Sequence, residues 1–261
     1  MRGKGTLTMI LQHPRDRQNQ QQGFSLVELL VAMAMAGIVM AAIYSTYKSQ
    51  QDTYVAQEQV AEMQQNLRAS LYQMGRDIRM AGFNPQRSPN VGGFTDIKLD
   101  GDDIDETTTN STNIAFYMDL NAPGTPGLSN GQIDPNDNDE QIAYRFNPAN
   151  NGLEKFRVSD DTWQTVADNI ENLNFVYLDG DGIPVDPTTA TNLPLIRSVQ
   201  ITVLARTGAF DRDFTNNQTY ENQMDPLNAD EAPYYWSFTA PGDNYRRRLL
   251  STTILCRNMG I

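Results

Sequence analysis

The feature that most constrains this chain is a long apolar segment close to its start. From Leu29 to Tyr44 the sequence has no charged residue, and Leu26 and Val27 extend the apolar run backwards past one acid, Glu28. As a helix, residues 26–44 would span about 28 Å, at roughly 1.5 Å per residue, which is close to the hydrocarbon thickness of a bilayer. The sequence therefore predicts a transmembrane helix over residues 26–44.

The charges that flank this segment predict its orientation. The residues before it carry one acid, Asp16, and four basic residues: Arg2, Lys4, Arg15 and Arg17. By the positive-inside rule, the N-terminus is expected to stay in the cytoplasm and the remainder to be exported. No second apolar stretch of this length occurs in the sequence, so a single-pass or cleaved topology is expected.

Three interpretations of the segment differ in how they explain Glu28, and the first two explain it poorly. A secretory signal would use the basic leader and small-residue sites such as Ala32-Met33-Ala34, but an acid at the head of the apolar run fits that pattern poorly. A plain anchor leaves Glu28 unexplained, because a carboxylate in the bilayer costs about 2.5–3.5 kcal/mol on insertion scales. A local role stays open, since Ser25 and Glu28 have the spacing of a helix capping box.

The third interpretation uses the whole junction. The run Gly23-Phe24-Ser25-Leu26-Val27-Glu28, placed between a basic polar leader and a continuous apolar segment, resembles the type III signal of type IV pilins and type II secretion pseudopilins. The resemblance implies that a prepilin peptidase removes residues 1–23 by cleaving after Gly23 and then methylates Phe24. It also implies that Glu28 accepts the N-terminal amine of a neighbouring subunit during assembly, which would stabilise a desolvated carboxylate.

Beyond the apolar segment the sequence has the pattern of a half-buried helix. Apolar residues recur at spacings of three and four, as expected for one buried face. These residues are Val60, Met63, Leu67, Leu71, Met74 and Ile78. Gly82 suits a left-handed helix cap and Pro85 cannot continue a helix. A long N-terminal helix, half membrane-embedded and half amphipathic, is therefore expected within residues 24–82.

The remainder, residues 83–261, is expected to form a β-rich periplasmic or extracellular domain. Six short apolar or alternating runs, bounded by turn residues, are typical of strands. They begin at Ile114, Gln141, Leu153, Leu173, Ser198 and Leu249. A turn at residues 147–152 predicts a hairpin, and the run 234–236 is expected to be a core strand. Loops 84–112, 121–139 and 208–244 are long. The expected fold class is α+β: the helix packed on an antiparallel sheet.

Composition argues against catalysis and against cofactors. The chain has a net charge of −12, one cysteine, Cys256, and one histidine, His13, so disulfide, multi-histidine and nucleic-acid functions have little support. Loss of the leader would remove four basic residues, one acid and the histidine, and would shift the charge by three, to −15. The acid-rich runs 134–140 and 179–182 do not fit a calcium-binding loop, so solvated turns and no metal are expected. The basic run 246–248 is expected to guard a strand edge or to form ion pairs.

A resemblance also extends beyond the signal. Residues 76–83, 170–178, 198–203 and 247–258 are similar, in the same order, to segments of PilW-type minor pilins. This implies a non-enzymatic subunit of the type IV pilus that helps to initiate assembly at the tip. Its expected partners are other minor pilins, the major pilin, the prepilin peptidase, the inner-membrane assembly platform and membrane lipid, without nucleic acid. The expected location is the inner membrane and then the pilus surface. A J-type minor pseudopilin and a secreted or anchored β-rich binding module are the alternatives.

Overall fold

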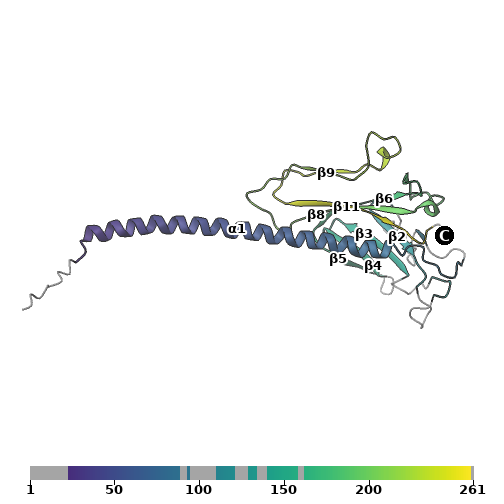
Figure 1. Cartoon of the computed structure of the whole chain (residues 1–261), viewed down its shortest axis with the longest axis horizontal. Coiled ribbons are helices and arrows are strands. Elements are labelled where there is room, and N and C mark those ends of the chain that lie inside the picture. Colours follow the sequence, from purple (N-terminus) through teal and green to yellow (C-terminus); the bar gives the residue numbers. More distant parts are fainter. Residues whose placement is uncertain are drawn as a thin grey trace, which may run out of the picture. The chain divides into compact units, whose positions relative to one another are not determined.

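The computed structural model describes residues 23–88, 93–94, 110–120, 129–133, 140–157 and 162–259. These residues form one long helix, two short 3₁₀ helices (η2 and η3) and a set of antiparallel strands (Figure 1). In chain order the elements are α1 (Leu26–Ile78), β1 (Gly93–Phe94), β2 (Asn113–Tyr117), β3 (Gln141–Asn147), β4 (Gly152–Arg157), β5 (Thr162–Ala167), β6 (Ile170–Leu178), β7 (Pro184–Val185), η2 (Leu193–Leu195), β8 (Ser198–Arg206), β9 (Thr219–Glu221), η3 (Ala232–Tyr234), β10 (Ser237–Thr239) and β11 (Arg247–Leu255). Residues 1–22, which hold nearly all of the expected leader, lie outside the described residues.

The chain divides into two compact units, residues 1–52 and 53–261. In the first unit the described residues form the beginning of α1, and every one of them is exposed. The exposed side chains include large apolar groups from Leu26 through Ile43. Within the described chain nothing covers these side chains, so this part of α1 needs lipid or another protein around it.

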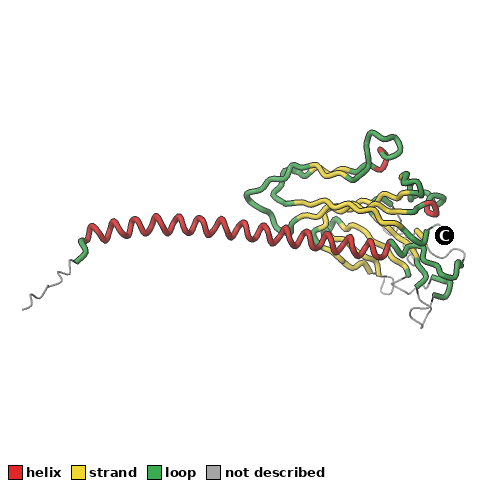
Figure 2. Tube along the Cα trace, viewed as in Figure 1, coloured by secondary structure: helices red, strands yellow, loops and turns green. Residues whose placement is uncertain are grey.

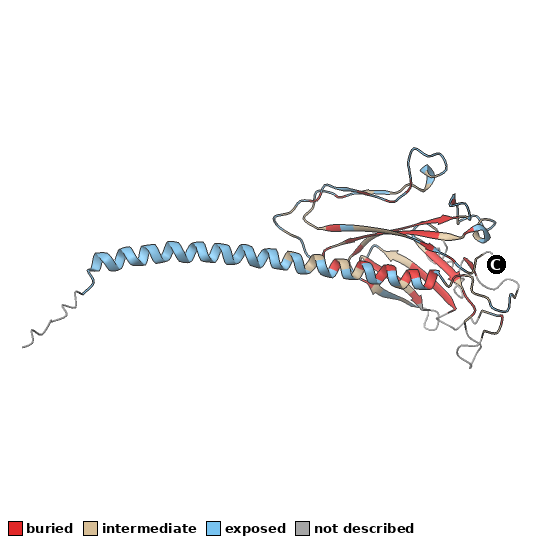
Figure 3. Ribbon diagram, viewed as in Figure 1, coloured by how far each residue is buried: buried red, intermediate tan, exposed pale blue. Residues whose placement is uncertain are grey.

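The second unit contains the amphipathic part of α1. Met63, Leu67, Leu71, Met74 and Ile78 are buried at the expected spacings, which confirms the predicted stripe. Figure 3 shows the buried residues of α1 gathered in its C-terminal part.

The helix ends at Ile78, within the expected range 24–82. Two tight turns follow, in which the N–H groups of Met80 and Ala81 donate to carbonyls three residues back. Gly82 then adopts a φ of +77°, and its N–H bonds the carbonyl of Tyr117. This left-handed conformation is the one that glycine accepts without strain.

The first sheet has five strands in the order β1-β2-β3-β4-β5, all antiparallel. The expected hairpin is present: β3 and β4 pair through Asn147 and Gly152, and Asn151 takes a positive φ of 50° in the turn. Strand β5 was not expected from the sequence. It lies at the sheet edge, and most of its residues are exposed or half-buried.

The second sheet has four strands in the order β11-β8-β6-β7. β8 is paired on both sides, with β6 and with β11, and its nine-residue register with β11 is unbroken. The sequence predicted the principal strands but grouped them into one sheet. The described residues instead form two larger sheets and a separate two-stranded ribbon, and this corrects the single-sheet expectation.

One hydrophobic cluster joins the C-terminal part of α1 to both larger sheets. Its members include Leu67 and Met74 of α1, Phe116 of β2, Phe175 of β6 and Ile201 of β8. α1 and the antiparallel sheets thus share one core, and the second unit is an α+β domain.

The ribbon β9-β10 covers the other face of the four-stranded sheet (Figure 2). Tyr220 of β9 and the buried Ala240 pack against Leu204 of β8. The segment 208–244 is therefore not one long loop, as expected, but holds a hairpin. The expected core strand at 234–236 is also wrong, because Tyr234 ends η3 and all three residues are only half-buried.

Candidate processing and assembly site

The junction at the start of α1 is extended and exposed. Gly23, Phe24 and Ser25 precede the helix, and the Phe24 side chain is 87% exposed. The carbonyl of Ser25 accepts the first helical bond, from the N–H of Leu29, at 3.1 Å. Ser25 is therefore the N-cap residue, and the bond between Gly23 and Phe24 lies just outside the helix.

Glu28 folds back onto this junction. Its Oε2 accepts the main-chain N–H of Ser25 at 3.3 Å, which is one half of the capping box expected from the spacing. The carboxylate also lies in the first turn of α1, where the helix dipole favours negative charge. Glu28 remains exposed in the single chain, so its second oxygen is accessible to another group.

These residues open a helix that is long enough and apolar enough to cross a membrane. α1 is the one such helix among the described residues, and none of its most apolar stretch is buried within the protein. Gly23, Phe24 and Glu28, which the sequence singled out as parts of one junction, lie at the head of an apolar helix that no described residue covers. This arrangement offers an exposed backbone to a peptidase and an apolar surface to lipid or to other helices.

Sequence reasoning missed a second feature, at the opposite end of α1. Asp77, whose side chain is 8% exposed, accepts the hydroxyl of Tyr144 on β3 at 2.6 Å and Nζ of Lys155 on β4 at 3.0 Å. Burial and the charge of Asp77 together raise the pKa of the Tyr144 hydroxyl. This network fixes the last turn of α1 to the five-stranded sheet. The available signal was an acid directly beside Ile78 in an apolar stripe.

The basic run 246–248 is ion-paired, as expected, for two of its three members. Arg246 donates to Asp211, and Arg247, whose side chain is fully buried, donates to both Glu171 and Asp243. These pairs tie β11 to the loops around it and to the start of β6. Their role is structural.

The acid-rich turns give no metal site within the described residues. Oδ1 of Asp179 accepts the N–H groups of Asp181 and Ile183, each at 2.9 Å, as in an ordinary turn. No cluster of three candidate ligands occurs in the described parts of the chain. Residues 134–139 of the other run lie outside them.

Two models of known protein families match this chain. Residues 18–44 match the model of the prokaryotic N-terminal methylation motif, and residues 56–224 match the model of prepilin peptidase-dependent protein B. The second match covers more than half of the chain. The chain belongs to the prepilin peptidase-dependent protein B family.

The resemblance to type IV pilins that the junction indicated is thereby confirmed. This family member is a type IV pilin-like protein that depends on a prepilin peptidase, carries a prepilin methylation signal and is anchored in a membrane by its apolar helix.

Two further comparisons concern curated proteins and solved structures. A comparison with curated proteins finds no match. Among solved structures, the family member is similar to a type IV-like pilin from Thermus thermophilus, with 10% sequence identity and a TM-score of 0.48, over 76% of this chain and 96% of that one.

Proposed function

We propose that this protein is a minor pilin, a structural subunit that helps to initiate type IV pilus assembly at the tip. The observation that carries the proposal is the N-terminal methylation motif at the head of an apolar helix that nothing in the described chain covers. A secretory signal would be lost on processing, whereas a prepilin helix is kept and needs partners. The helix would first lie in the inner membrane, with the N-terminus in the cytoplasm, and later in the pilus.

In this proposal the prepilin peptidase cleaves after Gly23 and methylates Phe24. The geometry supports cleavage there, because the bond lies outside the helix and its neighbours are exposed. Glu28 then accepts the amine of a neighbouring subunit. Its carboxylate already faces the main chain of residue 25, and a positive amine is the partner that best stabilises a carboxylate leaving water.

The proposed partners are other minor pilins, the major pilin, the prepilin peptidase, the inner-membrane assembly platform and lipid. No catalytic role is proposed for this protein. A J-type minor pseudopilin of a type II secretion system would use the same junction and the same helix. Deletion mutants distinguish the two: loss of surface pili supports the proposal, while loss of protein export with normal pili supports the pseudopilin.

Intact mass and N-terminal sequencing test the processing step. Protein isolated from membranes is expected to begin at methylated Phe24, and to retain residues 1–23 in cells without the prepilin peptidase. A start after Ala36 in either strain would instead identify a secretory signal and contradict the proposal.

A pair of substitutions separates the two roles of Glu28. Glu28→Gln keeps an oxygen that can accept the Ser25 N–H but removes the charge. We expect both Glu28→Gln and Glu28→Ala to be cleaved normally and to be absent from sheared pili. Ser25→Ala, which keeps the carboxylate, serves as the matched control and is expected to be incorporated. Normal incorporation of Glu28→Gln would show that only the capping contact matters.

A further inference from the structure

In the part of the chain that the structure describes, strand β11 has one unpaired edge. Among the described residues it pairs with β8 alone, at one side of the four-stranded sheet. At its two ends the ladder bonds run from Thr207 N to the Arg246 carbonyl and from Cys256 N to the Arg197 carbonyl. Bonded and non-bonded pairs alternate in an antiparallel ladder, so the even-numbered residues of β11 bond β8. The odd-numbered residues present their N–H and C=O groups outward: Leu249, Ser251, Thr253 and Leu255.

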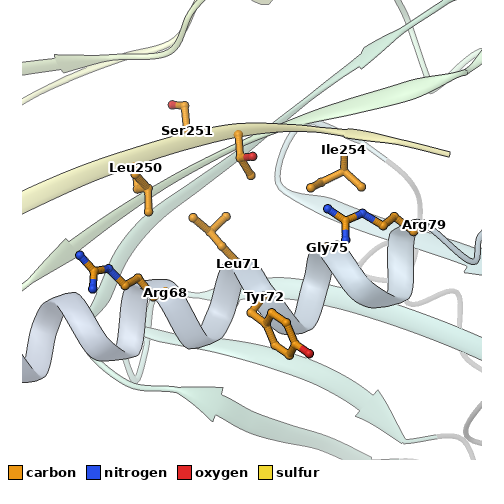
Figure 4. Close-up of a pocket in the computed structure, with 9 residues that line it drawn as sticks. Arg68, Leu71, Tyr72, Gly75, Arg79, Leu250, Ser251 and Ile254 are labelled. Atoms are coloured by element: carbon orange, nitrogen blue, oxygen red, sulfur yellow. The ribbon is translucent and has the colours of Figure 1, made fainter.

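Beside this edge lies a groove between β11 and α1, about 320 Å³ in volume. Figure 4 shows Leu71 projecting from α1 toward β11, where Leu250 and Ile254 complete an apolar floor. Gly75 allows the close approach, since a Cβ at this position would lie 3.1 Å from Cδ1 of Ile254. The groove lies wholly within the second unit.

Three arginines that form no ion pair with a described residue flank the groove. Arg68 and Arg79 stand at its two ends (Figure 4), and Arg248 lies on the same face of β11 as Leu250 and Ile254. All three arginines are exposed, and within the described residues none of them forms an ion pair. Their guanidinium groups are therefore available to carboxylates of another molecule.

We propose that this edge and groove bind an extended acidic segment of a neighbouring subunit, which joins the four-stranded sheet as a fifth strand beside β11. The outward main-chain groups of β11 would pair with the added strand, and its carboxylates would pair with Arg68, Arg79 and Arg248. That the segment belongs to another pilin-like subunit rests on the proposed function. A second copy of this chain fits less well, because edge-to-edge pairing of two β11 strands would bring two sets of these arginines together.

Binding of short labelled peptides to the full chain in detergent micelles tests the proposal. The probes are a nine-residue peptide of alternating Glu and Val, the same peptide with Lys for Glu, and the Glu peptide with a central Pro. Fluorescence polarisation is expected to show binding of the first peptide that weakens with salt, and at least tenfold weaker binding of the other two. Equal binding of the Lys peptide, or no binding of any peptide, would overturn the proposal.

Paired substitutions locate the site. Thr253 is exposed and its N–H points away from β8, so Thr253→Pro removes one outward donor and leaves the ladder with β8 in place, while Thr253→Ala keeps that donor. We expect the Pro variant to bind the Glu peptide about tenfold more weakly and the Ala variant to bind it normally. Arg79→Gln is expected to weaken binding several-fold, whereas Arg212→Gln, which does not line the groove, leaves it unchanged.

Hydrogen exchange on the parent protein gives a readout that no variant's folding can confound. The bound Glu peptide should slow exchange at the amides of Leu249, Ser251, Thr253 and Leu255, with little change on the five-stranded sheet. Protection elsewhere would overturn the proposal, as would concentration-dependent dimers that occlude β11 when no peptide is present. Cleavage after Gly23 is measured in a separate experiment. A failure of peptide binding would therefore not contradict the proposed function, and a failure of processing would not contradict the peptide result.

Discussion

At the scale of single residues, the second unit contains charged side chains that are buried but paired. Arg247 is the clearest case: its Nη2 lies 2.7 Å from Oε1 of Glu171 and 2.6 Å from Oδ2 of Asp243. Its side chain is fully buried, so the guanidinium has exchanged water for these two carboxylates. These ion pairs fix the position of β11 relative to β6. Replacing all three side chains by apolar groups need not lower the free energy of unfolding.

Removing only the cation is a different matter. Arg247→Met would leave Glu171 and Asp243 close together without their main counterion, and we expect it to lower the free energy of unfolding by about 3–5 kcal/mol. Arg248→Met, the neighbouring exposed arginine, is the control and should change it by less than about 0.5 kcal/mol. Urea unfolding followed by tryptophan fluorescence measures both. Equal effects would show that Arg247 is not specifically stabilising.

The same cluster predicts how stability depends on pH. The hydrogen bond from Arg247 lowers the pKa of the Asp243 carboxyl, and the unfolded value is about 3.9. A lowered folded pKa means that the contribution is fully present above about pH 4 and is lost as the pH falls through the folded value.

We therefore expect the parent protein to lose stability in acid more steeply than Asp243→Asn does. The variant should already be less stable at neutral pH, and its melting temperature should change less below about pH 4. Asp181→Asn, an exposed acid in a turn, is the control and should follow the parent curve. Parallel curves for the parent and Asp243→Asn would contradict this account.

At the scale of elements, α1 is one helix whose two parts have different surroundings. Its first part is apolar all round and exposed, and its last part has one buried stripe against the shared core. Leu67→Ala removes a buried side chain from that core, and we expect it to cost about 2–5 kcal/mol. Leu30→Ala, the same substitution at an exposed position, should leave unfolding of the domain unchanged within about 0.5 kcal/mol. Thermal melts of both variants in detergent provide the comparison.

What the sequence predicted at this scale follows from how local each signal is. The stripe from Met63 to Ile78 and the turn at residues 147–152 each depend on residues that are close in the sequence. Both predictions are confirmed. Strand β5 was missed because an exposed edge strand needs no apolar run. The division into two sheets was missed because it depends on which distant strands pair, and apolar patterns do not specify pairing.

At the scale of the whole molecule, the same distinction between local and distant residues separates the candidate processing site from the groove beside β11. Gly23, Phe24 and Glu28 lie within six residues of one another, so the candidate processing site could be proposed from the sequence, and the methylation motif matches the surrounding residues 18–44. The groove beside β11 joins Arg68 to Leu250, residues far apart in the chain. Only the folded domain brings them together, and no local pattern predicts such a site.

A last prediction concerns the independence of the second unit. The shared core begins at Val60, so residues 53–261 contain all of the buried stripe and both larger sheets, while the apolar exposed part of α1 is left out. We expect this fragment to fold and to remain soluble without detergent, because the large apolar surface that requires lipid is gone. Its midpoint of thermal unfolding by circular dichroism should equal that of the full chain in detergent. A lower midpoint, or aggregation of the fragment, would show that the first part of α1 also stabilises the domain. An equal midpoint would leave that part free to serve membrane insertion and contacts between subunits.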